Sequence, residues 1–362
     1  MQGKYRALWL DKKGNLEVID QTKLPFEYET KVLTNAFESI LAIKDMTVRG
    51  AGVIGNVAAF GVYLAAREVG GDLVMLEALA GQIRDSRPTA VNLMWAVDRM
   101  MAYAKSSDLT GAALVEALKQ EAILIADEDV VRTEKIGRYG ADIIEQIMVE
   151  KRLTRFNLLT HCNAGWLAIV DSGTALAPVY EAQRRGINIH VWVDETRPRN
   201  QGANLTAWEL SQAGVKHTVI ADNVGGHLMQ HGMVDMVVTG ADRVARSGDA
   251  ANKIGTYLKA LAAHDNAVPF YIALPASTFD FEVLDGVAEI PIEIRDEDEV
   301  KIMRGIDAEG RASTLQIVQS ASPALNYGFD VTPARLIAGL ITERGVCDPT
   351  VEAVEAMFED LI

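Results

Sequence analysis

The chain is poor in cysteine and in long apolar runs. Its 362 residues include only two cysteines, Cys162 and Cys347, which are too few for a disulfide framework. No apolar stretch approaches the length of a membrane-spanning helix, and the N-terminus lacks the basic-then-apolar order of a secretory signal. We therefore expect a cytoplasmic protein with no membrane partner.

Basic residues are also scarce relative to acidic ones. The 35 Lys and Arg residues face 50 Asp and Glu residues, which gives a net charge of −15. A field of this sign repels phosphate backbones, so we expect no nucleic-acid partner. A small phosphorylated ligand stays compatible, because a few arginines in a concave site outweigh the global field at short range.

Signatures of nucleotide and metal binding are missing or incomplete. Gly50–Gly55 has the spacing G-x-G-x-x-G, but Ser39–Met46 before it has a helical pattern and Asn56–Arg67 after it has the pattern of one continuous helix. A dinucleotide site needs strands at both places. His227 and His231 are four residues apart without the glutamate of a zinc motif. We expect neither a cofactor nor a metal.

The pattern of the chain changes near residue 150. Residues 1–150 begin with short β-rich runs and continue as helix, which predicts a small N-terminal mixed α+β domain. Residues 151–362 alternate strands with helices, which predicts an α/β, Rossmann-like, doubly wound parallel-sheet domain. The expected strands there are 156–160, 187–193, 216–221, 233–239 and 268–274, and the expected helices are 173–185, 205–213 and 254–264.

Residues that directly follow these strands are the first candidates for a site, since ligands bind at the carboxyl ends of such sheets. Cys162 follows the first strand, where a thiol can act as acid, base or nucleophile, although an inert buried cysteine is an equal alternative. Asp242 follows the fourth strand, where a carboxylate suits acid–base work, the alternative being a helix cap. Asn252 and Lys253 come soon after it, so polar groups converge there.

Arginine-bearing turns are candidates for anion binding. Arg49 and the small residues after it can form a helix N-terminus whose N–H groups bind a phosphate, the alternative being close packing of glycines between helices. The loops around Arg87 and over Thr196–Gly202 each open a predicted helix and suit phosphate or hydroxyl contacts, with an ordinary solvated loop as the alternative.

These segments, taken in order, resemble the methylthioribose-1-phosphate isomerase family over nearly the whole chain. The matching motifs include TVRGA at 47–51, RPTAVNL at 87–93, LTHCN at 159–163, DETRPR at 194–199, QGANLTAWEL at 201–210, GADR at 240–243 and NKIGT at 252–256. The resemblance implies an aldose–ketose isomerase of methionine salvage that acts on a small phosphorylated sugar as a homodimer. It places catalysis on Cys162 and Asp242, and substrate contacts on Arg49, Gly50, Ala51, Arg87, Gln201, Asn252 and Lys253.

Several segments depart from the family pattern. They are Ala51-Gly52, Ile292–Asp296, 301–319 and Asn326–Asp330. They leave open the group at C5 of the sugar, so isomerisation of 5-deoxyribose 1-phosphate or ribose 1,5-bisphosphate is an alternative. A second alternative is a non-catalytic regulatory subunit of the initiation-factor exchange complex, which shares the fold; that reading predicts loss of Cys162 and Asp242, and both are present.

Overall fold

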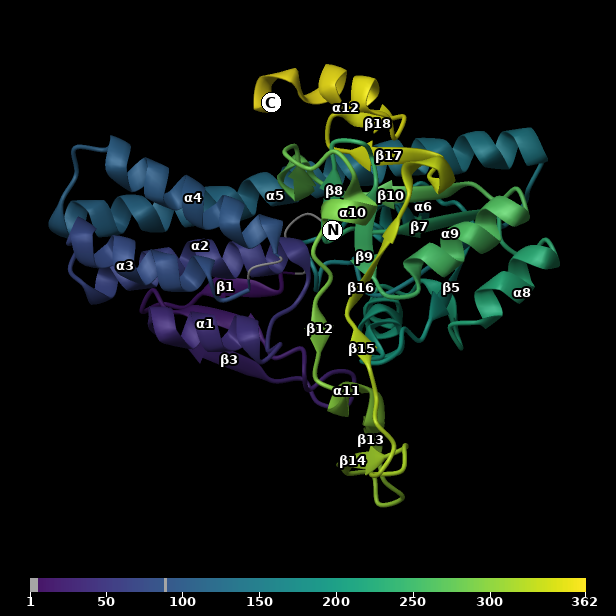
Figure 1. Ribbon diagram of the computed structural model, residues 1–362, viewed down its shortest axis with the longest axis horizontal. Helices are drawn as coiled ribbons and strands as arrows, with labels where there is room; N and C mark the ends of the chain where they lie inside the picture. Colours follow the sequence, from purple (N-terminus) through teal and green to yellow (C-terminus); the bar gives the residue numbers. More distant parts are fainter. Residues whose placement is uncertain (1–5, 88–89) are drawn as a thin grey trace.

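The N-terminal part of the chain is a small sheet packed on helices (Figure 1). The computed structural model describes residues 6–87 and 90–362, so residues 88–89 of the Arg87 loop lie outside it, as does the first residue of Tyr5–Leu10, the first of the β-rich runs expected as strands. Three antiparallel strands form the sheet: β1 (Leu8–Leu10), β2 (Leu16–Ile19) and β3 (Thr30–Leu33). The helices are α1 (Ala36–Lys44), α2 (Ala51–Glu68), α3 (Leu73–Arg84), α4 (Val91–Ser106) and α5 (Gly111–Lys151).

A seven-stranded sheet forms the centre of the second part. Its spatial order is β18-β17-β10-β7-β4-β5-β6, and every pairing is parallel except that of β17 with β18. The strands are β4 (Phe156–Thr160), β5 (Ile189–Asp194), β6 (Lys216–Ile220), β7 (Met236–Thr239), β10 (Phe270–Ala273), β17 (Gly339–Thr342) and β18 (Gly345–Cys347). The chain runs outward from β4 to β6 and then returns to the other side of β4, so the strand order reverses between β4 and β7. The predicted doubly wound sheet is confirmed.

Helices cover both faces of this sheet, as its five mostly buried central strands require. One face packs against the C-terminal half of α5, α6 (Ala177–Arg184) and α7 (Ala207–Gln212). The other packs against α8 (Val224–Gln230), α9 (Thr256–Asp265) and α12 (Val351–Phe358). A π-helical turn, Gly202–Thr206, precedes α7.

Smaller sheets that the residue pattern did not predict lie at the carboxyl edge of the large one. A four-stranded sheet has the order β11-β8-β9-β16, a two-stranded sheet pairs β12 with β15, and a hairpin pairs β13 with β14. The latter hairpin projects from the body of the molecule (Figure 1). The elements are β8 (Arg243–Ala245), β9 (Ala250–Lys253), β11 (Phe279–Asp280), α10 (Gly286–Glu289), β12 (Ile294–Arg295), α11 (Asp298–Lys301), β13 (Ile302–Ile306), β14 (Ala312–Gln316), β15 (Asn326–Tyr327) and β16 (Phe329–Thr332).

Helix α5 joins the two parts rigidly. Its N-terminal half belongs to the core of the first part, and its C-terminal half packs against the large sheet. The domain boundary expected after residue 150 falls at its last turn and stays a prediction. Within the described ranges, no helix is both long and apolar enough to cross a membrane.

The start of α2 touches the turn that follows β4. Gly50, the residue before the helix, has φ +97°, and a Cβ there would lie 2.5 Å from the Cα of Ala168. The N–H of Val53 donates to the Ala168 carbonyl at 2.8 Å. A Cβ on Gly52 would likewise overlap Ile169, at 2.3 Å from its Cγ1. The Gly50–Gly55 run therefore opens a helix, with no strand before it.

This contact predicts a large cost for the smallest possible side chain. Gly50→Ala adds a methyl group against backbone in a conformation that L-residues rarely adopt, so we expect the free energy of unfolding to fall by at least about 2 kcal/mol. Gly81→Ala is the control, because Gly81 lies inside α3 with open space around its Cα and should gain up to about 1 kcal/mol. Urea denaturation measures the stability of both variants. Equal unfolding midpoints for Gly50→Ala and the unmodified protein would contradict the close contact between Gly50 and Ala168.

Candidate active site

Cys162 and Asp242 lie on either side of the point where the strand order reverses. Cys162 follows β4 and Asp242 follows β7, the two strands that are paired there. Ligands of doubly wound sheets bind in the crevice at this point. A cavity of about 440 Å³ opens there, and Cys162, Asp242, Arg49, Gly50 and Ala51 all line it. Residues from strand ends and from the start of α2 thus meet around one space.

Cys162 is held by its backbone. Its φ is +67°, in the left-handed region that residues with a Cβ rarely adopt. Its N–H donates to the Thr196 hydroxyl at 2.9 Å, and its carbonyl accepts from the Thr206 hydroxyl at 2.7 Å. These two bonds fix a strained backbone conformation, and neither of them involves the thiol. The segment after Cys162 is a series of turns and α6 begins only at Ala177, so the helix N-terminus at this cavity is that of α2.

Asn163 fixes Arg49 at the N-terminus of α2. The two terminal nitrogens of Arg49 donate to Asn163, one to the side-chain oxygen at 2.7 Å and one to the backbone carbonyl at 2.9 Å. Among the described residues no side chain caps α2, and the Val53 N–H is bonded to the Ala168 carbonyl, which leaves the N–H groups of Ala51 and Gly52 for a ligand. A guanidinium beside uncapped backbone N–H groups is suited to bind a phosphate.

A second, mainly apolar cavity of about 430 Å³ adjoins the first and shares Ala51 and Asp242 with it. Its remaining wall consists of Ile54, Arg87, Ala90, Arg243, Ala251, Ile290, Pro291 and Phe329. Burial lowers the pKa of Arg87, and the carboxylates of Glu293 and Asp242 partly offset this effect. The Nη2 of Arg87 lies 3.5 Å from Glu293, whereas its Nε is buried without a partner in the described residues. Asp242 therefore lies at the boundary between the first cavity and this mainly apolar one.

Asn252 and Lys253 reach the site from β9, in the smaller sheet. Asn252 lines the first cavity. Lys253 is buried, donates to the Gly328 carbonyl at 2.8 Å, and lies 4.4 Å from the ring centre of Phe329. Burial lowers the pKa of Lys253, and the nearby Cys162 and Asp242 act in the opposite direction.

Gln201 and the arginines of its loop lie farther out. Gln201 lines a neighbouring cavity that shares Arg49 with the first, and its amide oxygen is buried without a partner in the described residues. Arg197 instead donates to the Val300 carbonyl, and Arg199 pairs with Glu299 at 2.8 Å. The two arginines therefore hold α11, the short helix that precedes the projecting hairpin. Arg199 lines the same cavity as Gln201, but its guanidinium is already paired with Glu299.

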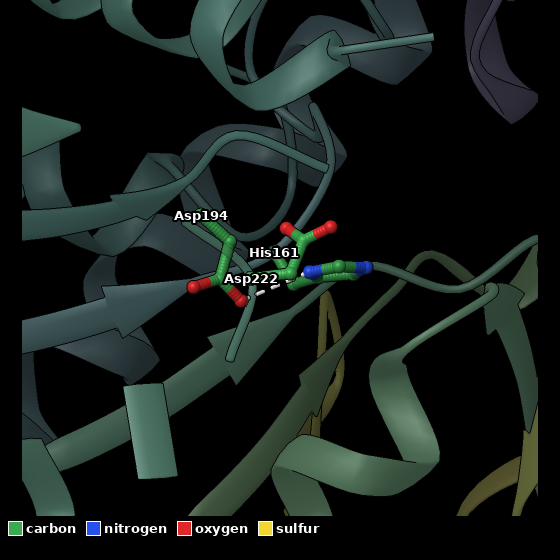
Figure 2. A group of neighbouring side chains, drawn as sticks. All are labelled: His161, Asp194 and Asp222. Carbon is green, nitrogen blue, oxygen red and sulfur yellow. Dashed lines mark hydrogen bonds and ion pairs between the residues drawn. The ribbon is translucent and has the colours of Figure 1, made fainter. Parts of the chain in front are cut away.

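Figure 2 shows a group of neighbouring polar side chains, His161, Asp194 and Asp222, in which His161 is the residue before Cys162 in the chain. The Nδ1 of His161 is 3.0 Å from Asp194, and its Nε2 is 2.8 Å from the Ile254 carbonyl. Burial raises the pKa of Asp194, and His161 and Lys259 lower it. His161, Asp194 and Asp222 could together offer three metal ligands. However, the Lys259 ammonium lies 3.2 Å from Asp194, and Asp222 accepts the N–H groups of Thr196 and Arg197. These carboxylates already have cationic or hydrogen-bonded partners, so we expect no metal there.

Glu209, on α7, is fully buried beside the turn after β4. Its carboxylate accepts four hydrogen bonds, from the side chains of Asn163 and Tyr180 and from the N–H groups of Trp166 and Leu167. Burial raises the pKa of Glu209 to about 7, and the four bonds oppose that rise.

Sequence reasoning assigned no role to Glu209 or to the apolar wall. A signal for Glu209 was present, since a carboxylate between Trp208 and Leu210 on the buried side of a short helix is unusual. The wall carried no local signal, because Ile54, Ile290 and Phe329 come from segments far apart in the chain.

Comparisons with known proteins agree with this architecture. The model of the initiation factor 2 subunit family matches residues 47–349. A protein of Sulfurimonas denitrificans named methylthioribose-1-phosphate isomerase is 61% identical over 99% of both chains. One of Gluconobacter oxydans with the same name is 53% identical over 98% of this chain and 97% of its own.

Two solved structures match over almost their full lengths. A 5-methylthioribose 1-phosphate isomerase of Pyrococcus horikoshii is 37% identical with a TM-score of 0.83, covering 99% of this chain and 100% of that one. The delta subunit of translation initiation factor eIF-2B from A. fulgidus is 38% identical with a TM-score of 0.77, covering 98% and 100%.

The raised pKa of Glu209 predicts how stability depends on pH. The folded protein holds this proton more tightly than the unfolded chain, whose value is near 4.5, so the stabilisation is complete below that pH and is lost as pH rises through about 7. The loss should reach about 3 kcal/mol. The check is the difference in unfolding free energy between the wild type and Glu209→Gln at several pH values. A difference that stays constant from about pH 4.5 to about pH 8 would contradict the prediction.

Proposed function

The chain belongs to the initiation factor 2 subunit family, and we infer that it is an aldose–ketose isomerase that converts 5-methylthioribose 1-phosphate into 5-methylthioribulose 1-phosphate in methionine salvage. The observation that carries this function is the shared cavity, which is lined by Cys162 and Asp242 together with Arg49 and the first residues of α2. Two groups that exchange protons, next to a phosphate-binding helix end, are what this reaction needs.

The reaction has a particular difficulty, because phosphate blocks the anomeric oxygen. The sugar ring opens only if its ring oxygen gains a proton as the C1–O bond to it breaks. A hydrogen then moves from C2 to C1, and the C2 hydroxyl loses its proton to leave the ketone. The reaction gains and loses no electrons overall, so no external redox partner is involved. Our proposal is that Cys162 and Asp242 divide the two proton transfers.

The phosphate in this proposal lies at the start of α2. Arg49, Gly50 and Ala51 contact it there, and Arg87, Gln201, Asn252 and Lys253 supply further donors around the sugar. The support is positional: Arg49 lines two adjoining cavities, and both the Nε of Arg87 and the amide of Gln201 are buried with polar atoms unpartnered in the described residues.

The apolar cavity favours methylthio as the group at C5. Seven of its ten lining residues have apolar side chains, and the large or branched ones, Ile54, Ile290 and Phe329, come from three separate segments of the chain. Two arginines lie in its wall and each is already close to a carboxylate, Arg87 to Glu293 at 3.5 Å and Arg243 to Asp280 at 3.1 Å. A second phosphate at C5 would enter an apolar space with little free positive charge, which is unfavourable.

A regulatory role is the competing function, because one similar structure is a translation initiation factor subunit. The identity of 61% to a named isomerase, over 99% of both chains, favours the enzyme. The resemblance further supports a homodimer located in the cytoplasm, and both of these stay part of the proposal.

Removal of either proposed proton-transfer group should abolish most turnover. Cys162→Ala and Asp242→Asn are each expected to lower kcat by about 10²–10⁴-fold while the fold is kept. Cys347→Ala is the matched control, since Cys347 lies on β18 and lines neither cavity. Turnover by Cys162→Ala or Asp242→Asn within threefold of the control would remove that residue from the mechanism.

A comparison of substrates tests the group at C5. We expect kcat/KM to be highest with methylthioribose 1-phosphate, about 10–200-fold lower with 5-deoxyribose 1-phosphate, and lowest with ribose 1,5-bisphosphate. Ile290→Ala should reduce the difference in kcat/KM between methylthioribose 1-phosphate and 5-deoxyribose 1-phosphate, because it removes part of the apolar wall. A preference for the bisphosphate would reassign the substrate, and turnover of none of the three would favour the regulatory function.

A further inference from the structure

Glu209 touches neither of the cavities around Cys162, yet it contacts the residue that holds Arg49. Its Oε1 accepts from the Asn163 amide nitrogen at 2.9 Å, while the Asn163 amide oxygen accepts from Arg49 at 2.7 Å. The three side chains form one continuous chain of hydrogen bonds from a buried carboxylate to the guanidinium at the start of α2.

The direction of each bond in this chain is fixed by chemistry. Arg49 can only donate, so the oxygen of the Asn163 amide must face it and the NH₂ group must face Glu209. All four groups around Glu209 donate to it, two of them backbone N–H groups. A carboxylate satisfies four donors, whereas an amide in its place would turn an NH₂ group toward at least one of them.

The surrounding backbone is shaped to admit this carboxylate. A Cβ on Gly165 would lie 1.7 Å from the Oε2 of Glu209, so the turn after β4 requires glycine there. The N–H groups of Trp166 and Leu167 hold the same turn to the carboxylate. The next residue of that turn, Ala168, is the one against which Gly50 packs. Glu209 therefore supports both parts of the anion site, the guanidinium and the seat of the helix N-terminus.

We propose that Glu209 is a positioning residue for the substrate phosphate, which acts through the Asn163 amide to aim Arg49 into the cavity. The inference rests on the proposed function, in that the phosphate is taken to bind at Arg49. The backbone of Cys162 is held by Thr196 and Thr206, and it joins the Glu209 network through the longer bond, at 3.2 Å, from the Asn163 amide nitrogen to the Thr206 hydroxyl. Loss of Glu209 should therefore weaken substrate binding more than turnover.

The first experiment compares steady-state kinetics and sulfate binding among variants. Glu209→Gln and Gly165→Ala should each raise both KM and the dissociation constant of sulfate about tenfold, with kcat changed by less than threefold. Asp235→Asn is the control, because Asp235 is a buried carboxylate that holds the N–H of Asn157 at the opposite edge of the sheet. It should lose stability and keep its KM. An unchanged KM and sulfate affinity in Glu209→Gln would overturn the proposal.

A double-mutant cycle separates positioning from general destabilisation. If Glu209 acts through Arg49, then Glu209→Gln should add no further rise in KM to that of Arg49→Ala. An undiminished effect in the Arg49→Ala background would assign Glu209 a structural role only. Calorimetry measures sulfate binding without turnover. A wild-type protein that is inactive as an isomerase, but whose sulfate affinity depends on Glu209, would contradict the proposed function and support this inference.

The pH dependence of sulfate binding gives a second measurement should Glu209→Gln fail to fold. Protonation of Glu209 removes one acceptor site, so the wild type should bind sulfate more weakly as pH falls through about 7. Sulfate keeps its charge in this range. In the described residues, α6 presents one titratable group to Glu209, Tyr180, and the turn after β4 presents amides. Asn163→Ser removes the amide that links Glu209 to Arg49, so it should abolish the pH dependence of sulfate binding. The same pH dependence in Asn163→Ser would overturn the proposal.

Discussion

The site depends on one backbone contact, between the first residues of α2 and the turn that follows β4. Gly50 and Gly52 leave no room for a Cβ there, and the Val53 N–H is bonded to the Ala168 carbonyl. The contact brings the N-terminal half of the chain onto the carboxyl edge of the sheet. Without it, Arg49 and the helix N-terminus would not share a cavity with Cys162 and Asp242, which come from the other half.

The basic residues of the site give it a charge opposite in sign to the net charge of the molecule. The chain carries −15 overall, yet Arg49, Arg87 and Lys253 converge on one region, where burial lowers the pKa of both Arg87 and Lys253. Buried cations without full pairing are costly, and an anionic ligand relieves that cost. The same reasoning applies to the buried, unpartnered polar atoms of Arg87 and Gln201. A phosphorylated ligand is therefore the natural complement of this cavity despite the acidic surface.

Sequence reasoning reached the parts of the structure that depend on local pattern. The strand Phe156–Thr160 has the predicted bounds, and the positions just after β4 and β7 face a cavity because parallel strand ends share one edge. It missed β17, β8, β9 and β16, which are short or belong to sheets formed by distant pairings, as with β9 and β16. It also missed Glu209, whose importance lies in contacts with a turn more than forty residues earlier in the chain. Local periodicity carries no record of such pairings.

The separation of fold from chemistry explains how one family can include proteins named as isomerases and as initiation factor subunits. Within the described residues, the hydrogen bonds that tie Cys162 and Asp242 to the fold run through their backbones: Cys162 to Thr196 and Thr206, and Asp242 to the Ala251 carbonyl. Their side chains can therefore change without loss of a structural bond. The sheet, the glycine contact and the Glu209 network would persist in a protein that had lost the proposed proton-transfer groups. Such a protein would keep a preformed anion cavity at its centre, which is a ready starting point for a binding function.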